Sequence, residues 1–156
     1  MDVHSISTHC TRTEFVGTAV LDTIGLVISG IDDTLLKEMK IGTAYHALGL
    51  FSSRTGAAGQ ITAMDDAVKA TNTELLSVEF PRDTKGWGGH GNYMVIGGKD
   101  ISDVRHAIEL ALDLTNKYAG ELYISASGHL EFAFSASAGP ALTKAFDAVP
   151  DAAFGF

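Results

Sequence analysis

The sequence predicts an α+β domain in which an antiparallel sheet carries its two longer helices on one face. Short runs rich in Val, Ile and aromatic residues alternate with clusters of turn residues, as strands do. Two longer segments, Ile61–Thr71 and Val104–Tyr118, repeat apolar residues at helical spacing. From Tyr45 to Ser127 the expected order is strand, helix, strand, loop, strand, helix, strand. This order is a split βαβ pattern, and 156 residues suffice for one such domain with extensions.

The expected strands are the runs whose residues favour a pleated, half-buried backbone. In chain order they are Glu14–Val20, Thr23–Ile31, Tyr45–Phe51, Glu74–Phe80, Tyr93–Gly97, Glu121–Ser127 and His129–Ser137. Only Leu21 and Asp22 separate the first two strands, so we expect a hairpin there. Gly128 separates the last two strands in the same way.

The expected helices have apolar residues three or four positions apart. They are Thr34–Lys40, Ile61–Thr71, Val104–Tyr118 and Ala141–Phe146. Carboxylate and hydroxyl side chains just ahead of a helix accept hydrogen bonds from its free N–H groups. We therefore expect Asp32 or Asp33 to cap the first helix, and Ser102 and Asp103 to cap the third.

A glycine-rich loop, Pro81–Asn92 (PRDTKGWGGHGN), lies between two of the expected strands. Its glycines allow backbone angles closed to other residues, which suits close approach of the backbone to a ligand or to another copy of the chain. The polar and aromatic side chains among them are Lys85, Trp87, His90 and Asn92. An ordinary surface hairpin explains the glycines equally well. Trp87 packed against its own sheet is likewise as well supported as Trp87 at a ligand site.

The composition argues against several classes of function. The net charge is -8 and the pI about 5.0, whereas binding to nucleic acid needs clustered Lys and Arg. Cys10 is the only cysteine, so an internal disulfide is excluded. The first residues lack the apolar core of a signal peptide, and no apolar run approaches the roughly 20 residues that span a bilayer. We expect a soluble, intracellular protein with neither nucleic acid nor membrane as a partner.

No catalytic centre is expected. The 6 histidines form neither an HExxH nor an HxxxH pattern, and Ser127–His129 lacks the surroundings of a nucleophile elbow. Lys85 precedes the glycines, whereas the lysine of a phosphate-binding loop follows them. His4 and His9 lie near Cys10, but a flexible segment explains them better than a metal site. We therefore expect no catalysis, no metal and no cofactor.

Long strings in the sequence resemble bacterial microcompartment shell proteins. These strings are Thr13–Ile28 (TEFVGTAVLDTIGLVI), Met64–Glu74 (MDDAVKATNTE) and Pro81–Gly91 (PRDTKGWGGHG). The resemblance is to the first half of circularly permuted, tandem-domain shell proteins of the propanediol- and ethanol-utilisation B type. Leu26–Lys40 resembles the usual C-terminal strand and helix of the family, moved to the front.

The resemblance implies a circularly permuted bacterial microcompartment domain over residues 14–146. A flexible segment, 1–13, would precede it, and residues 147–156 would be a tail or the start of a linker to a missing second domain. The implied function is a structural, non-enzymatic shell protein in the cytoplasm. It would associate with itself into trimeric or hexameric tiles and with other microcompartment shell proteins. Pores in these tiles would pass small metabolites such as polyols, alcohols and aldehydes.

The resemblance also implies roles for individual residues. The residues expected at the pore or in contact with a ligand are Lys85, Gly86, Trp87, Gly88, Gly89, His90 and Asn92. Those expected at contacts between tile edges are Lys99, Asp65 and Lys69. For Asp65 and Lys69, an ordinary exposed helix surface is expected equally.

A second interpretation is a soluble small-ligand-sensing oligomeric module of ferredoxin-like type, because the split βαβ unit serves that function too. The two interpretations differ in assembly. A sensor should form a small closed oligomer, whereas a tile should form rings that join edge to edge. Tandem relatives carry two such domains in one chain, so both a trimer and a hexamer stay open.

Overall fold

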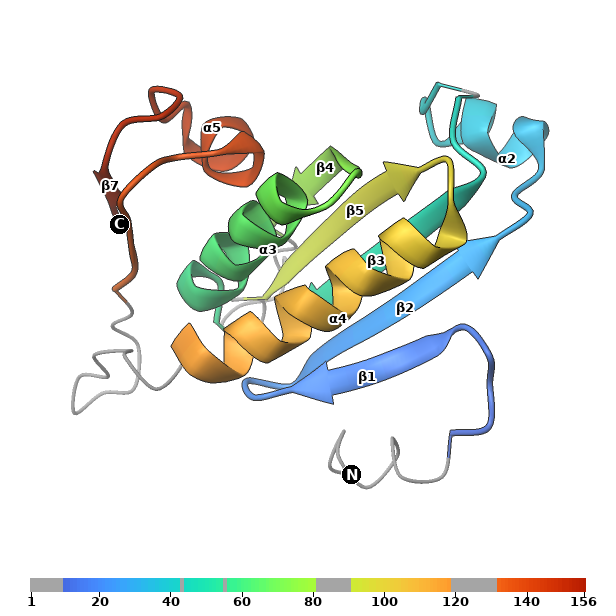
Figure 1. Cartoon of the computed structure of the whole chain (residues 1–156), viewed down its shortest axis with the longest axis horizontal. Coiled ribbons are helices and arrows are strands. Elements are labelled where there is room, and N and C mark those ends of the chain that lie inside the picture. The colour runs from blue at the N-terminus through green and yellow to red at the C-terminus, as the bar shows by residue number, and fades with distance from the viewer. Residues whose placement is uncertain (1–9, 43, 55, 81–90, 119–131) are drawn as a thin grey trace, which may run out of the picture.

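The fold is built on a five-stranded antiparallel sheet in the order β1-β2-β3-β5-β4 (Figure 1). The computed structural model describes residues 10–42, 44–54, 56–80, 91–118 and 132–156. The strands of the sheet are β1 (Phe15–Ala19), β2 (Thr23–Ser29), β3 (Ala47–Ser53), β4 (Glu74–Glu79) and β5 (Asn92–Gly98). A second, two-stranded sheet pairs β6 (Phe134–Ser135) with β7 (Phe154–Gly155).

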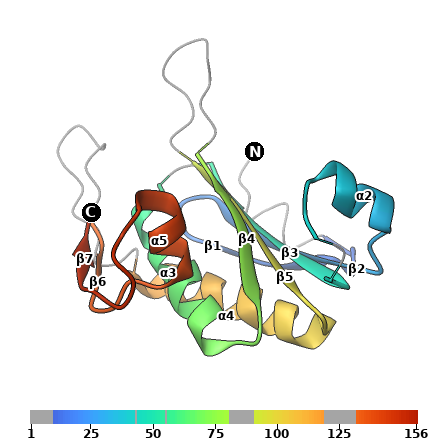
Figure 2. The same cartoon turned by 90° about the horizontal axis from the view of Figure 1, so that it is seen from above.

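The two longer helices cover one face of the five-stranded sheet, as the sequence predicts. The helices are α2 (Asp33–Glu38), α3 (Ala58–Ala70), α4 (Ile101–Tyr118) and α5 (Pro140–Phe146). Along β3, Gly49 lies against Ile108 of α4, whereas its neighbour Leu48 packs with Leu36 of α2. Because side chains alternate across a strand, α2 lies on the face opposite to α4, as Figure 2 shows.

Helix α4 lies very close to the sheet because glycines stand beneath it. A β-carbon on Gly25 would come within 2.4 Å of Ile108 Cγ2, and one on Gly49 would come within 2.9 Å of Ile108 Cδ1. A β-carbon on Gly17 would lie 3.3 Å from Leu112 Cδ1, a tight but milder contact. The buried residues between the helices and the sheet form one continuous core, which also includes Leu142 of α5.

Two local predictions are confirmed and two are wrong. The hairpin between β1 and β2 turns at Leu21 and Asp22, which both have positive φ, at 61° and 53°. Asp32 caps α2, since its Oδ1 accepts a hydrogen bond of 2.8 Å from the Thr34 N–H. Ser102 and Asp103 do not cap α4, because that helix begins at Ile101 and both residues lie in its first turn. The expected strand 121–127 lies outside the described residues. Of the expected strand His129–Ser137, only Phe134–Ser135 is a strand among the described residues, and it pairs with β7.

The C-terminal residues pack on the rest of the domain. The backbone of Phe156 exchanges hydrogen bonds of 2.8 and 3.0 Å with that of Ala133, beside the β6–β7 pair. The rings of Phe154 and Phe156 also lie against the ring of Phe146, with centroids 5.8 and 4.7 Å from it. That these residues begin a linker stays a prediction.

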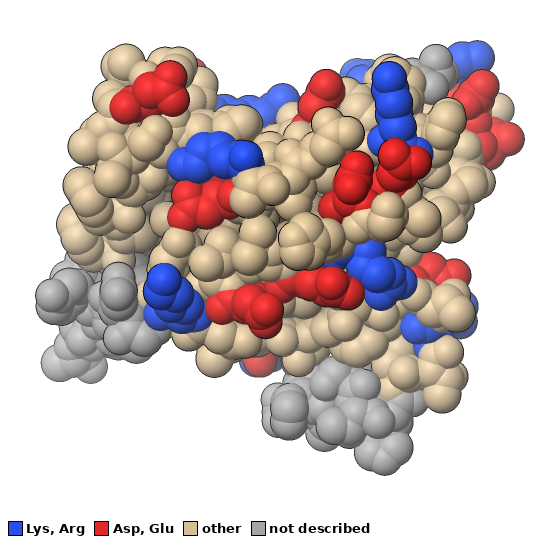
Figure 3. All heavy atoms as spheres, in the orientation of Figure 1, with Lys and Arg blue, Asp and Glu red and all other residues tan. Residues whose placement is uncertain are grey.

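Charges are mixed over the face that carries α3 and α4. Acidic and basic side chains lie beside one another there, with uncharged surface between them (Figure 3). Within the described part of the chain, none of the helices combines the length and the apolar character needed to cross a bilayer.

Candidate functional site

The glycine-rich loop leaves the sheet at the end of β4 and returns at the start of β5. Residues 81–90 lie outside the described residues, and the predicted pore residues Lys85, Gly86, Trp87, Gly88, Gly89 and His90 are among them. Both ends of the loop are described. The candidate site is therefore built from the residues that hold these ends.

The returning end of the loop is held against the end of β3. At Gly91 the backbone approaches Ser53 so closely that a β-carbon would lie 2.1 Å from the Ser53 carbonyl oxygen. The next residue, Asn92, is fully buried, and its Nδ2 donates to Ser53 Oγ at 2.7 Å and to the Gly56 carbonyl at 3.4 Å. Ser52 Oγ donates to the Asn92 carbonyl at 3.0 Å. Glycine is thus required at position 91, and Asn92 fixes the start of β5.

A second buried polar pair lies beside this contact. Thr23 is the register partner of Ser53 across β2 and β3, and both are buried. Gln60 Nε2 donates to Thr23 Oγ1 at 3.3 Å, and Thr23 Oγ1 donates to the Val20 carbonyl at 2.7 Å. Asn92 Oδ1 is buried with no hydrogen-bond partner among the described residues. The side chain of Asn92 is therefore enclosed at the base of the loop.

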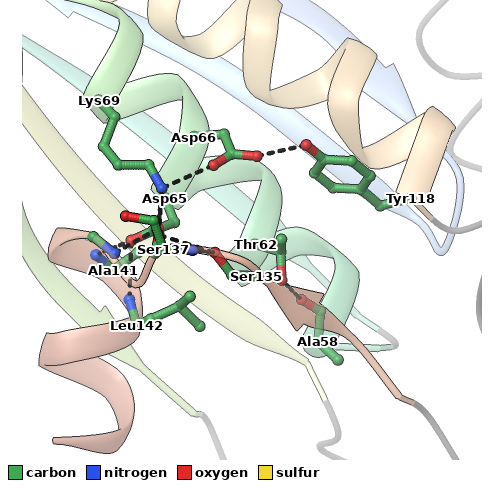
Figure 4. A network of polar contacts seen from close by, with 11 residues as sticks. Ala58, Thr62, Asp65, Asp66, Lys69, Tyr118, Ser135, Ser137, Ala141 and Leu142 are labelled. Carbon is green, nitrogen blue, oxygen red and sulfur yellow. Dashed lines mark hydrogen bonds and ion pairs between the residues drawn. The ribbon is translucent and has the colours of Figure 1, made fainter. Parts of the chain in front are cut away.

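Helix α5 contacts β4, the strand from which the loop leaves the sheet. The start of α5 is capped by a residue of another helix (Figure 4). The N-cap residue of α5, Gly139, makes no side-chain capping bond, and Pro140 has no N–H to donate. The fully buried carboxylate of Asp65, on α3, accepts hydrogen bonds from the backbone N–H groups of Gly139, Ala141 and Leu142 at 2.8, 2.9 and 3.2 Å. A carboxylate suits this place because a helix N-terminus presents unpaired donors and a positive dipole end.

Lys69 connects this cap to the end of α4. Its Nζ lies 3.0 Å from Asp65 Oδ2 and 3.1 Å from Asp66 Oδ1, and it donates to the Ser137 carbonyl at 2.7 Å. Asp66 Oδ2 in turn accepts a hydrogen bond of 2.5 Å from the Tyr118 hydroxyl. Burial lowers the pKa of the Lys69 ammonium, but its bonds to the two carboxylates outweigh burial and hold that pKa above the ordinary 10.5.

Two tyrosines on the opposite face of the sheet have raised pKa values. The Tyr45 hydroxyl donates a hydrogen bond to Glu74 Oε2, and this bond, with burial and the charge of Glu74, raises the pKa of Tyr45. Burial and the charge of Glu79 raise the pKa of Tyr93. Both hydroxyls therefore stay neutral at physiological pH.

The expectation that Asp65 lies on an exposed helix surface is wrong. Its side chain is 0% exposed because its carboxylate is enclosed by the start of α5. The Lys69 side chain is 33% exposed and bound within its own chain. Lys99 is exposed in the turn between β5 and α4. Contacts of Lys69 and Lys99 with neighbouring tiles stay predictions, whereas the Asp65 side chain is enclosed within its own domain.

Sequence reasoning missed the Asp65 cap and the Ser53 contact. One signal for the cap was available: Gly139 and Pro140 open a helix without a capping side chain, so another segment has to supply acceptors. No local signal marks Ser53, because its partner lies 39 residues away.

In the described ranges, no group of three His, Cys, Asp or Glu side chains is placed to hold a metal ion.

The fold now defines the class of protein. The family model described as the BMC domain matches residues 47–127, from the start of β3 through α4 and beyond. The chain belongs to the BMC domain family.

Similar proteins agree with this assignment. Over 89% of its length the chain is 50% identical to the bacterial microcompartment shell protein PduB of Citrobacter freundii. Over 93% of its length it is 48% identical to the shell protein of the same name from Limosilactobacillus reuteri. The chain spans 52% and 61% of the lengths of these two relatives.

Solved structures agree as well. The crystal structure of a trimeric bacterial microcompartment shell protein PduB superposes with a TM-score of 0.81 at 47% identity, covering 92% of this chain and 64% of that one. The crystal structure of EtuB from Clostridium kluyveri gives a TM-score of 0.84 at 47% identity, covering 94% of this chain and 64% of that one. EutL from Clostridium perfringens shares the fold, with a TM-score of 0.64 at 16% identity, over 87% of this chain and 66% of that one.

Proposed function

We propose that this chain is a tile-forming shell protein of a bacterial microcompartment. The observation that carries the proposal is the 47–50% identity to shell proteins over nearly the whole chain, one of them trimeric in its crystal structure. These matches favour a shell protein over the ligand-sensing module. The function is structural and needs no catalytic centre. Its place is the shell in the cytoplasm, and its partners are further copies and other shell proteins.

In this proposal the glycine-rich loop lines a pore for small polar metabolites such as polyols, alcohols and aldehydes. Backbone N–H groups of Gly86, Gly88 and Gly89 would donate to such a molecule without side-chain bulk, while Lys85 and His90 would set the local charge. Around a symmetry axis, each contribution is multiplied by the number of subunits. Trp87 would set the width of the pore. The firm attachment of Asn92 at the start of β5 supports the proposal, because it fixes the point from which the loop extends.

The proposal includes circular permutation. The elements β1, β2 and α2 precede the span matched by the BMC domain model, and yet β2 pairs with β3 along its whole length. The front of the chain therefore completes the sheet of the matched domain, as a strand moved from the other end would do.

Native mass spectrometry of the purified chain tests the assembly. Three or six copies in one closed species support a tile, since a trimer or hexamer closes around one axis. A monomer, or a dimer that grows no further, contradicts the proposal that this chain forms a tile by itself.

Electron microscopy of the assembled protein tests the tile edges. We expect Lys99→Asp to block extended sheets while native mass spectrometry still shows closed rings, because Lys99 is exposed in a turn. Lys37→Asp on α2 changes the charge by the same amount and serves as the matched control. Sheets that persist in Lys99→Asp remove Lys99 from the edge contact.

A further inference from the structure

Helix α5 contacts both α3 and β4, the strand that leads into the glycine-rich loop (Figure 2). Asp65 of α3 holds the start of α5 through three backbone hydrogen bonds. Leu142 of α5 is fully buried in the common core. Phe146, the last residue of α5, places its ring centroid 5.9 Å from that of Phe80. One short helix thus connects a buried carboxylate to the leaving end of the loop.

Phe80 is the point at which this connection reaches the loop. It follows β4 directly and precedes Pro81, where the glycine-rich segment begins. Because β4 is an edge strand, its ladder hydrogen bonds to β5 hold it from one side only. Phe146 therefore supplies a contact at the strand end that the sheet itself does not.

The ring of Phe146 is itself held in place. Its centroid lies 4.7 Å from that of Phe156 and 5.8 Å from that of Phe154, and those two rings lie 5.5 Å apart. Tilted and offset aromatic pairs at such distances are favourable beyond the area they bury. The C-terminal residues thus pack against the same ring that contacts Phe80.

We propose that Phe146 is a positioning residue for the end of β4 from which the glycine-rich segment departs, with Asp65 as its anchor. The inference rests on the proposed function, in which that segment lines the pore. It assigns the segment 132–156 a role in that function, namely to fix where the pore-lining residues begin. The contacts that carry it lie entirely among described residues.

Hydrogen exchange of the full chain tests the proposal. In Phe146→Ala we expect exchange in a peptide covering Ser77–Phe80 to be about fivefold faster than in the wild type, because the strand end opens more readily without its aromatic partner. Exchange in β2 should be unchanged, since a local support has been removed and not the core. Trp87 is the only tryptophan of the chain, so acrylamide quenching of its fluorescence should increase in the same variant.

Matched variants separate positioning from a general loss of stability. Phe134→Ala removes a ring from the same C-terminal segment, one that is 60% exposed in β6, and should leave both readouts at wild-type values. Phe146→Tyr keeps the ring and should restore them. Asp65→Asn should change them in the same direction as Phe146→Ala but less. If Phe146→Ala does not fold, Phe146→Leu takes its place in the experiment, because leucine keeps apolar bulk without the ring.

Unchanged exchange at Ser77–Phe80 in a folded Phe146→Ala overturns the inference. A uniform increase across β2 and β4 overturns it as well, because Phe146 would then serve the core alone. Neither result depends on native mass spectrometry, which decides the proposed function separately. If the wild type forms a closed ring and exchange in Phe146→Ala is unaltered, the tile proposal stands and the positioning role is removed. If the wild type is a monomer and exchange in Phe146→Ala is altered, the positioning role stands and the tile proposal is removed.

Discussion

The backbone N–H of Ala141 donates a hydrogen bond of 2.9 Å to Oδ1 of Asp65, a residue 76 positions earlier in the chain. Two helices that are far apart in sequence are joined in this way by one buried carboxylate. Removing it leaves three backbone N–H groups at the start of α5 without their acceptor. Buried donors without an acceptor are costly, so the bond links the stability of the C-terminal segment to α3.

The first prediction concerns this carboxylate. Asp65→Ala should lower the free energy of unfolding by roughly 3 kcal/mol, and Asp65→Asn by about half as much, since the amide keeps one acceptor oxygen. Urea denaturation measures both values. Asp66→Ala, on the same helix but with a side chain 33% exposed, is the control and should cost less than about 1 kcal/mol. Equal losses at positions 65 and 66 would contradict the capping role.

The second prediction concerns the glycines beneath α4. In Gly49→Ala the new β-carbon would lie 2.7 Å from Ile96 Cγ1 and 2.9 Å from Ile108, and both neighbours are buried β-branched side chains. The variant should lose roughly 1–3 kcal/mol of stability by overpacking. Gly42→Ala has open space around it and should stay within about 0.5 kcal/mol of the wild type. Thermal unfolding of the two variants measures the stability that each loses, and equal losses would contradict overpacking at Gly49.

The third prediction concerns the turn between β1 and β2. Leu21 adopts a φ of 61°, a left-handed conformation that is unfavourable for a residue with a β-carbon. Leu21→Gly should therefore be more stable than Leu21→Ala by about 1 kcal/mol, because both lose the side chain and only glycine relieves the backbone. Denaturant midpoints of the two variants give the difference. Equal midpoints would show that this turn carries no backbone strain.

The fourth prediction concerns alkaline pH. The bond to Glu74 raises the pKa of Tyr45 in the folded state above its ordinary 10.0. A raised pKa means that Tyr45 contributes stability below pH 10, which is lost as the pH rises through the folded-state pKa. Tyr45→Phe should thus lose less stability over that interval than the wild type does. Absorbance titration of the tyrosines in Glu74→Gln provides the control, since Tyr45 should then ionise at lower pH.

The main elements follow from sequence because their signals are local. Periodicity identifies α3 and α4, and Val and Ile runs identify β1 to β5, since the core selects apolar residues on the face it covers. The Asp32 cap is predictable for the same reason, because donor and acceptor are two residues apart. The start of α4 was predicted a few residues late, because Ser102 and Asp103 resemble caps and yet lie inside the first turn.

The contacts around the loop do not follow from sequence, because they join distant segments. The sequence pattern of α3 predicts an exposed surface at Asp65. The Asp65 side chain is buried only because α5 packs over it. Ser53 and Phe146 are unremarkable in sequence, and each holds one end of the loop. Such contacts depend on tertiary arrangement, which periodicity does not encode.

The close approach of Gly91 to Ser53 also bears on how freely the segment between β4 and β5 can change in this chain. Both ends of the glycine-rich segment are fastened by residues outside it, at Phe80 through Phe146 and at Gly91 through Ser53. The entropy of closing a loop changes slowly with length, by only about 0.6 kcal/mol for each doubling. The residues between these two fastenings can therefore change in composition and in length at little cost to folding. The contacts that fasten the segment are thus separate from the segment itself.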